Sequence, residues 1–133
     1  MLKVRVYSGD LHVGDAELVA TDPPMGCAGG PFRPLASYLR IRPMVQEFCQ
    51  VFRDRASRDV YSAARARFDA LDWTLVAYDG AVLRPSGGID LYDFEELGDD
   101  SLEFHIYGLD DPRDSYRRYF ADDQTYREYY RQP

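Results

Sequence analysis

The chain has 133 residues, of which 45% are hydrophobic and 29% are charged, and its formal net charge is −7. This size and composition predict one globular domain, residues 1–133, that buries its core without a metal or a disulfide. They exclude a disordered polymer, and no apolar run approaches the roughly 20 residues that a membrane-spanning helix needs.

The charge is divided unevenly along the chain. Residues 1–71 hold ten Lys/Arg and eight Asp/Glu, whereas residues 72–133 hold six Arg and fifteen Asp/Glu. An acidic second half repels phosphate groups, so we expect neither nucleic acid nor an anionic membrane as a partner. A protein with a basic surface or a hard cation suits it better. The N-terminal residues lack a signal-peptide pattern, which predicts a cytoplasmic protein with reduced cysteines.

The first predicted element is a β-hairpin. Apolar and basic residues alternate over 2–7, Ser8-Gly9-Asp10 is typical of a turn, and residues 11–19 form the second strand with Gly14 as a candidate bulge. Residues 21–34 then contain four prolines and three glycines. Such a composition predicts a long loop, because proline breaks helices and is excluded from central strands.

Two helices are predicted next, over about 43–55 and 58–71. Pro43 suits a first helical turn, and apolar residues recur at helical spacing in both segments. Ser57 is a candidate N-cap for the second helix. One long helix is the alternative.

The remaining predicted elements are strands followed by a helix. Residues 73–78 and 81–83 predict a hairpin around Asp79-Gly80, residues 89–94 a short edge strand, and residues 102–107 a final strand. Asp111 and Pro112 predict the start of a C-terminal helix, within a segment 109–133 that docks on the domain. The predicted fold is α+β, with an antiparallel sheet of four to five strands, two central helices on one face and a C-terminal helix at an edge.

The proline- and glycine-rich segment carries a motif. From Asp22 to Pro34 it reads D-P-P-M-G-C-A-G-G-P-F-R-P. It resembles a loop, D-P-P-M-G-x-A-x-G-x-F-x-P, that follows an N-terminal hairpin in short uncharacterised bacterial proteins. The resemblance implies a shared fold and no activity. In those proteins the position of Cys27 is usually aliphatic, which argues against a nucleophilic role for this cysteine.

Two interpretations of this loop remain open. One is a rigid crossover between the hairpin and the helices, in which Met25 and Phe32 fill the core. The other is a ligand or partner loop in which the amides of Gly26 and of Gly29-Gly30 bind an anion or a peptide. In either case Asp22 can hydrogen-bond its own turn. The loop lacks the Lys and the Ser/Thr of a phosphate-binding loop, so we do not expect nucleotide binding.

Two further groups of residues are candidates for partner binding. The first is acidic and comprises Asp93, Glu95, Glu96, Asp99 and Asp100. The second is a stripe of tyrosines, flanked by arginines, on the predicted C-terminal helix, formed by Tyr116, Tyr119, Tyr126 and Tyr130. Tyrosine and arginine are enriched at protein–protein hot spots, although such a stripe can also pack on the domain's own sheet.

The predicted function is that of a non-enzymatic acidic module that masks a basic surface of a protein partner, as an inhibitor or immunity protein does. Alternatives are a small metal-dependent hydrolase that uses the acidic cluster, and a structural homodimer. A nucleophile formed by Cys27 with His12 or His105 is a weaker option. We predict no catalytic residues, no metal site and no cofactor.

Overall fold

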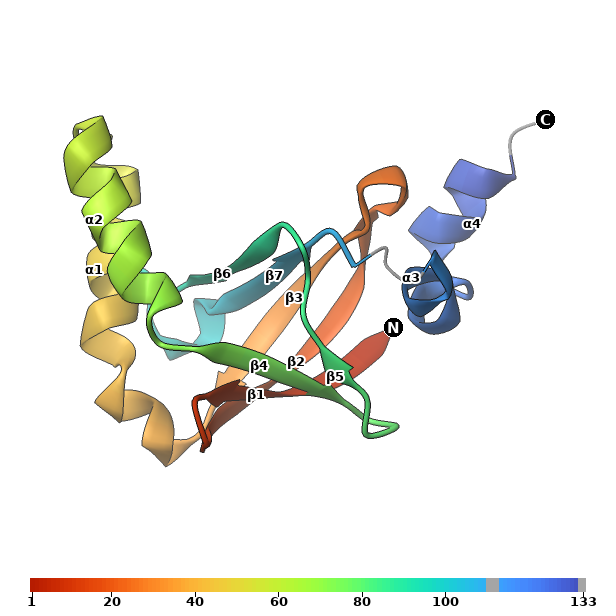
Figure 1. Ribbon diagram of the computed structural model, residues 1–133, viewed down its shortest axis with the longest axis horizontal. Helices are drawn as coiled ribbons and strands as arrows, with labels where there is room; N and C mark the ends of the chain where they lie inside the picture. Colours follow the sequence, from red (N-terminus) through yellow and green to blue (C-terminus); the bar gives the residue numbers. More distant parts are fainter. Residues whose placement is uncertain (110–112, 132–133) are drawn as a thin grey trace.

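Seven strands of the described chain form one antiparallel sheet. The computed structural model describes residues 1–109 and 113–131. The strands are β1 (Leu2–Ser8), β2 (Leu11–Asp22), β3 (Cys27–Pro34), β4 (Trp73–Ala77), β5 (Val82–Leu83), β6 (Gly88–Tyr92) and β7 (Glu103–Tyr107). They lie in the order β5-β4-β1-β2-β3-β7-β6 and curl into a half-barrel (Figure 1). The α+β class is confirmed, whereas the predicted number of four to five strands is wrong.

Both predicted hairpins are present. β1 pairs with β2, and their register shifts between Val6 and Tyr7, where Gly14 is the partner of Val6. This irregularity confirms the predicted bulge. β4 pairs with β5 through the Asp79-Gly80 turn, in which the amide of Gly80 donates to the carbonyl of Ala77 over 2.9 Å.

The segment predicted as a loop contains a central strand, so that prediction is wrong. A 3-10 turn, η1 (Pro23–Met25), leads directly into β3, which lies between β2 and β7. Proline has no N–H to donate. Pro31 lies at a gap in the pairing of β2 with β3, between the paired residues Gly29 and Phe32. The N–H that Pro31 lacks therefore falls where β2 and β3 are not paired, so no hydrogen bond of the ladder is lost.

Helices α1 (Arg42–Arg53) and α2 (Arg58–Asp69) confirm the two predicted helices. The Ser57 hydroxyl accepts a 3.4 Å hydrogen bond from the amide of Val60, so Ser57 is the N-cap of α2 and the chain does not form one long helix. The two helices lie at one end of the curled sheet and not across a face, contrary to the prediction (Figure 1). A 3-10 turn, η2 (Ala36–Arg40), joins β3 to α1.

The C-terminal segment forms two short helices, α3 (Arg113–Phe120) and α4 (Gln124–Tyr130), in place of the single predicted helix. The chain turns at Asp123, whose backbone is extended and whose carboxylate accepts a 2.9 Å hydrogen bond from the amide of Ala20. This contact ties the turn to β2. The predicted cap at Asp111 and the first-turn Pro112 lie outside the described residues. Both helices lie at the opposite end of the sheet from α1 and α2 (Figure 1).

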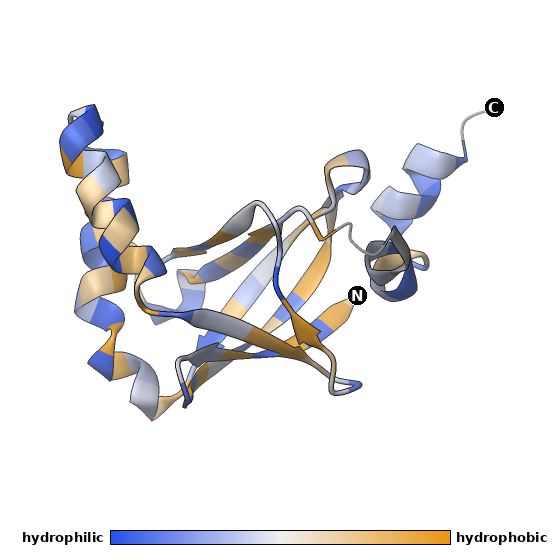
Figure 2. Cartoon of the chain, viewed as in Figure 1, coloured by the Kyte–Doolittle hydropathy of each residue, from blue (hydrophilic) through white to orange (hydrophobic). Residues whose placement is uncertain are grey.

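The core fills the inside of the half-barrel. Apolar and polar residues alternate along the strands (Figure 2), and most of the apolar ones are buried inside. Phe48 and Phe68 close the end under α1 and α2, with their ring centres 4.8 Å apart. Tyr116, Tyr119 and Phe120 contribute to the core from α3.

Candidate functional site

A buried carboxylate, Asp93, directly follows β6 and precedes the exposed acidic residues 95–100. It is 1% exposed and accepts hydrogen bonds from the Tyr38 hydroxyl (2.7 Å), Arg42 Nε (3.0 Å) and Gln46 Nε2 (3.3 Å). Burial and the adjacent carboxylate raise the pKa of Tyr38, so the phenol keeps its proton and remains a donor. Asp93 is an internal anchor, which corrects its prediction as a partner-binding residue.

The thiol of Cys49 on α1 belongs to the same anchor. Its Sγ donates to the carbonyl of Leu91 and accepts from the amide of Asp93, both over 3.3 Å. Burial raises the pKa of Cys49 to about 11, so the thiol is protonated at neutral pH and is not a nucleophile. Through these bonds α1 covers the outer edge of β6 and fixes the point from which the acidic residues project.

The acidic segment, residues 95–100, follows on two 3-10 turns, η3 (Glu95–Leu97) and η4 (Asp99–Ser101). Its acids are all exposed, as predicted, and they are Glu95, Glu96, Asp99 and Asp100. Arg53 contacts Glu96, and Arg42 contacts Asp99. Arginines of the basic first half therefore neutralise part of the acidic second half.

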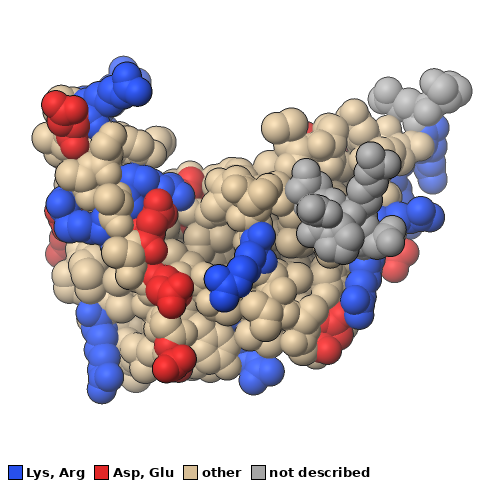
Figure 3. Space-filling model, viewed as in Figure 1, with Lys and Arg blue, Asp and Glu red and all other residues tan. Residues whose placement is uncertain are grey.

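The surface charge is accordingly more mixed than the sequence suggests. Other arginine–carboxylate pairs also join distant parts of the chain, such as Arg65 with Asp90 and Arg118 with Asp79. On the face shown in Figure 3, acidic and basic side chains are interspersed and do not form one continuous acidic patch.

An apolar hollow of about 190 Å³ lies beside the acidic segment and is lined by Phe52, Arg53, Phe94 and Leu97. Phe52 is 51% exposed and Leu97 is 60% exposed. The Arg53 guanidinium lies 5.7 Å from the centre of the Phe94 ring. We call this feature the Phe52 hollow. Exposed large apolar side chains gathered in one place are typical of a site that another macromolecule covers.

Sequence reasoning missed the residues that build this site. Phe52 continues the helical spacing of apolar residues in α1, a pattern typical of the buried face of a helix. Asp93 was grouped with its acidic neighbours, although Ile89, Leu91 and Asp93 follow each other at the two-residue spacing of a strand. Ile89 and Leu91 are buried. That spacing was a signal that Asp93 points to the same interior face.

The C-terminal tyrosines separate into two groups. Tyr116 and Tyr119 are each 5% exposed, which corrects their prediction as partner anchors. The Tyr116 hydroxyl donates to the carbonyl of Cys27 over 2.7 Å, and burial raises the pKa of Tyr116. Tyr126 is half-buried against the core and Tyr130 is 54% exposed, with their ring centres 4.5 Å apart. Only the outer part of the stripe reaches solvent.

The proline- and glycine-rich segment has a structural role at most of its predicted positions. Phe32 is buried, as the crossover interpretation predicted, but Met25 is 63% exposed and does not fill the core. Gly26 has a φ of +66° and donates its amide to the carbonyl of Pro23 over 3.0 Å. Asp22 is the last residue of β2 and is exposed.

Gly30 allows two strands to approach each other closely. A Cβ at this position would lie 1.8 Å from the carbonyl oxygen of Glu17 on β2. The glycine is therefore required by packing within the sheet. Since Gly29 and Gly30 pair with β7, the strand does not present them as a free anion-binding loop.

The two histidines have partners other than Cys27. His12 Nε2 lies 2.9 Å from a carboxylate oxygen of Asp15, and His105 Nε2 lies 3.1 Å from one of Glu103. The Cys27 thiol contacts the carbonyl of Met25 over 3.6 Å, and burial raises its pKa. No hydrogen bond joins Cys27 to a histidine in the part of the chain that the structure describes, so nothing here activates the thiol.

Within residues 1–109 and 113–131, no three His, Cys, Asp or Glu side chains are grouped so that they could hold a metal ion. None of the described helices has the length and apolar character needed to cross a membrane. No protein-family model matches the chain, and no curated protein and no solved structure is significantly similar to it.

Proposed function

We propose that this protein is a non-enzymatic binding module that docks a protein partner with a basic surface onto the acidic segment and the Phe52 hollow. One observation carries the proposal: Phe52 and Leu97 expose large apolar surfaces directly beside four exposed carboxylates. Masking a basic surface in this way is how an inhibitor or immunity protein acts.

Apolar and charged groups would contribute to binding in different ways. Apolar side chains in a hollow supply most of the affinity of a protein interface once water leaves them. Carboxylates around the hollow attract a basic partner and fix its orientation. Glu95 and Asp100 form no ion pair with another described residue, so both remain available to an incoming Lys or Arg.

The site is also preorganised for binding. The Asp93 anchor ties the start of the acidic segment to Tyr38, Arg42 and Gln46, and Leu102 is buried at its far end. A segment fixed at both ends loses little conformational entropy when a partner binds. Arg53 contacts Glu96, and Arg42 contacts Asp99. These contacts support the proposal that carboxylates of this segment can bind a guanidinium group.

The test is affinity capture with the immobilised full chain from an extract of its source cells. It is followed by calorimetry with the captured partner at about 50 mM salt, where the Debye length exceeds about 10 Å. Phe52→Ser with Leu97→Ser should weaken binding by about thirtyfold, as loss of a hot spot does. Glu95→Lys with Asp100→Lys should weaken it and remove most of its salt dependence.

Matched controls lie on other parts of the surface. Leu39→Ser removes an equally exposed apolar side chain, and Asp10→Lys reverses an exposed charge on the β1–β2 turn. Both should bind as the unmodified chain does. The proposal is wrong if no basic protein is captured at low salt, or if the controls weaken binding as much as the site variants.

A further inference from the structure

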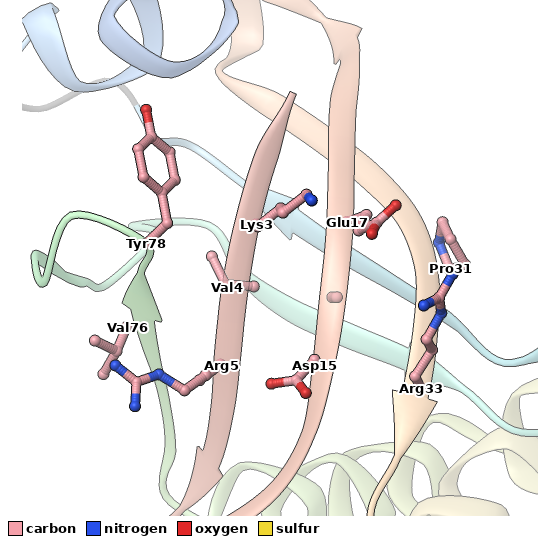
Figure 4. Close-up of a pocket in the computed structure, with 10 residues that line it drawn as sticks. Lys3, Val4, Arg5, Asp15, Glu17, Pro31, Arg33, Val76 and Tyr78 are labelled. Atoms are coloured by element: carbon pink, nitrogen blue, oxygen red, sulfur yellow. The ribbon is translucent and has the colours of Figure 1, made fainter.

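The outer face of the sheet carries two rows of residues that run across β4, β1, β2 and β3 (Figure 4). The register of the strands defines these rows. The first consists of Tyr78, Lys3, Glu17 and Pro31, and the second of Val76, Arg5, Asp15 and Arg33. Pro31 is placed opposite Glu17 by continuing the register one residue beyond the paired Ala16 and Phe32. Each row places a base on β1 directly opposite an acid on β2.

This face is open to solvent. Its residues line a groove of about 450 Å³, and Tyr78 at one margin is 66% exposed. In the view of Figure 4 the helices lie beyond the two ends of the strands and not across the labelled side chains. Among the described residues, Lys3, Arg5 and Glu17 form no ion pair within 4.0 Å, and the one partner of Asp15 is His12.

The pattern is complementary to itself under one rotation. Consider a two-fold axis that runs parallel to the strands, above the line between β1 and β2. It places β1 of a second copy over β2 of the first, and β4 over β3, without shifting either row along the strands. Lys3 then faces Glu17 of the other copy, and Arg5 faces Asp15, so every charge on the two inner strands meets an opposite charge.

The two outer strands match under the same rotation. Pro31 of one copy lies over Tyr78 of the other, and a proline ring packs well on an aromatic face. Arg33 lies over Val76, where its methylene groups can cover the apolar side chain. A two-fold axis perpendicular to the strands instead exchanges the rows and sets Lys3 against Arg5. Only the parallel axis avoids like charges.

We infer that the outer face of β4, β1, β2 and β3 is a dimer interface that binds a second copy of this chain about this two-fold axis. The surface is separate from the Phe52 hollow and does not depend on the function proposed above. With three bases and two acids interspersed, the face offers no excess of positive charge for a polyanion. Because bases and acids alternate across the strands, the face instead suits a second copy of itself whose strand order is reversed, so that bases of one copy lie over acids of the other.

The experiment measures mass in solution by sedimentation equilibrium of the full chain between about 5 and 500 μM, the range suited to a small interface. The unmodified chain should show a monomer–dimer equilibrium. Lys3→Glu sets a second carboxylate against Glu17 of the other copy, and Glu17→Lys sets two lysines against each other. Each single variant should weaken dimerisation by at least about tenfold, because like charges face each other twice in a two-fold interface.

The decisive step mixes the two single variants. In a heterodimer of Lys3→Glu with Glu17→Lys, position 3 of each copy faces an opposite charge at position 17 of the other copy, so both contacts of this row are again complementary. The mixture should therefore dimerise more tightly than either variant does alone. Arg5→Asp with Asp15→Arg provides a second complementary pair. The exposed Asp10→Lys is the matched control and should dimerise normally, and circular dichroism establishes that each variant is folded.

Three results would overturn the inference. One is a chain that remains monomeric over the whole concentration range. Another is a dimer that both single variants leave intact, which would place the interface elsewhere, for example at the exposed Tyr130. The last is a mixture of the two single variants that dimerises no better than either variant alone, since the proposed axis requires the two changes to compensate each other.

Discussion

The hydroxyl of Tyr38 donates a 2.7 Å hydrogen bond to the buried carboxylate of Asp93, although 55 positions separate the two residues. Tyr38 is on η2, before α1, and Asp93 follows β6, so this bond joins the entry of the helical pair to the base of the acidic segment. The candidate site therefore depends on a buried polar contact for its shape.

Replacing Tyr38 and replacing Asp93 should destabilise the fold to different degrees. Tyr38→Phe removes one donor from a charged acceptor and should cost about 1.5 kcal/mol in the free energy of unfolding. Asp93→Ala also leaves the guanidinium of Arg42 without its buried partner and should cost about 3 kcal/mol. Urea unfolding followed by circular dichroism measures both values.

The exposed Asp100 supplies the control for this pair of variants. Asp100→Asn removes a carboxylate from the same segment without disturbing a buried bond, and should change stability by less than about 0.5 kcal/mol. An Asp93→Ala chain as stable as Asp100→Asn would show that the buried network does not hold the segment.

Sequence patterns predicted the elements whose signals are local. The β1–β2 hairpin and the two helices follow from the spacing of apolar residues, and Ser57 caps α2 through a contact three residues away. β3 was missed because proline and glycine usually mark loops. The strand exists because Gly30 admits the backbone of Glu17 and because Pro31 lies at a gap in the ladder. Both conditions concern a neighbouring strand, which no local pattern reveals.

The candidate site was predicted less well for the same reason. The exposure of Glu95 and Asp100 follows from their charge. Whether Tyr116 faces solvent or the core depends on where α3 docks, and its hydroxyl bonds to Cys27, 89 positions away. Pairing of the basic half with the acidic half, as in Arg42 with Asp99, likewise depends on tertiary contacts. Composition gives the charges of the two halves but not their distribution in space.

The two cysteines should differ in reactivity. Burial raises the pKa of Cys49 to about 11, which leaves roughly one thiolate per thousand molecules at pH 8, and the residue is 1% exposed. Cys27 is only partly buried. Iodoacetamide at pH 8 should therefore alkylate Cys27 in the folded chain and reach Cys49 only in denaturant, as mass spectrometry of the peptides would show.

A Cys27→Ser variant isolates the second thiol. Its native form should gain no alkyl group over the time in which the unmodified chain gains one. Modification of Cys49 at a rate equal to that of Cys27 would mean that α1 opens readily from the edge of β6.

Docking of α3 should weaken at acid pH. The Asp79 carboxylate accepts hydrogen bonds from the amide of Ala81 and the hydroxyl of Tyr119 and lies beside Arg118, and these contacts lower the pKa of Asp79. Because the pKa is lower in the folded state, the ionised form stabilises the fold above the ordinary pKa of about 4. That contribution is lost as the pH falls through the lowered value.

Hydrogen exchange of the backbone amides of α3 provides the measurement. Between pH 6 and about pH 3, after correction for the intrinsic exchange rate, protection should fall in the unmodified chain. In Asp79→Asn it should be lower at pH 6 and vary less with pH. Asp10→Asn, on the opposite hairpin turn, should behave as the unmodified chain does. Equal pH dependence in Asp79→Asn would assign the acid sensitivity to another group.

Adjacent glycines on β3 should respond very differently to alanine. At Gly30 the added Cβ would lie 1.8 Å from the backbone oxygen of Glu17, whereas at Gly29 it would meet the ring of His105 at 2.4 Å. A backbone can move only by separating β2 from β3, so Gly30→Ala should cost about 3 kcal/mol or prevent folding. The His105 side chain can rotate away, so Gly29→Ala should cost about 1 kcal/mol.

Urea unfolding of the two variants, supported by the yield of soluble chain, measures the difference. Equal stability of the two variants would mean that β2 and β3 are not packed as closely as Gly30 requires.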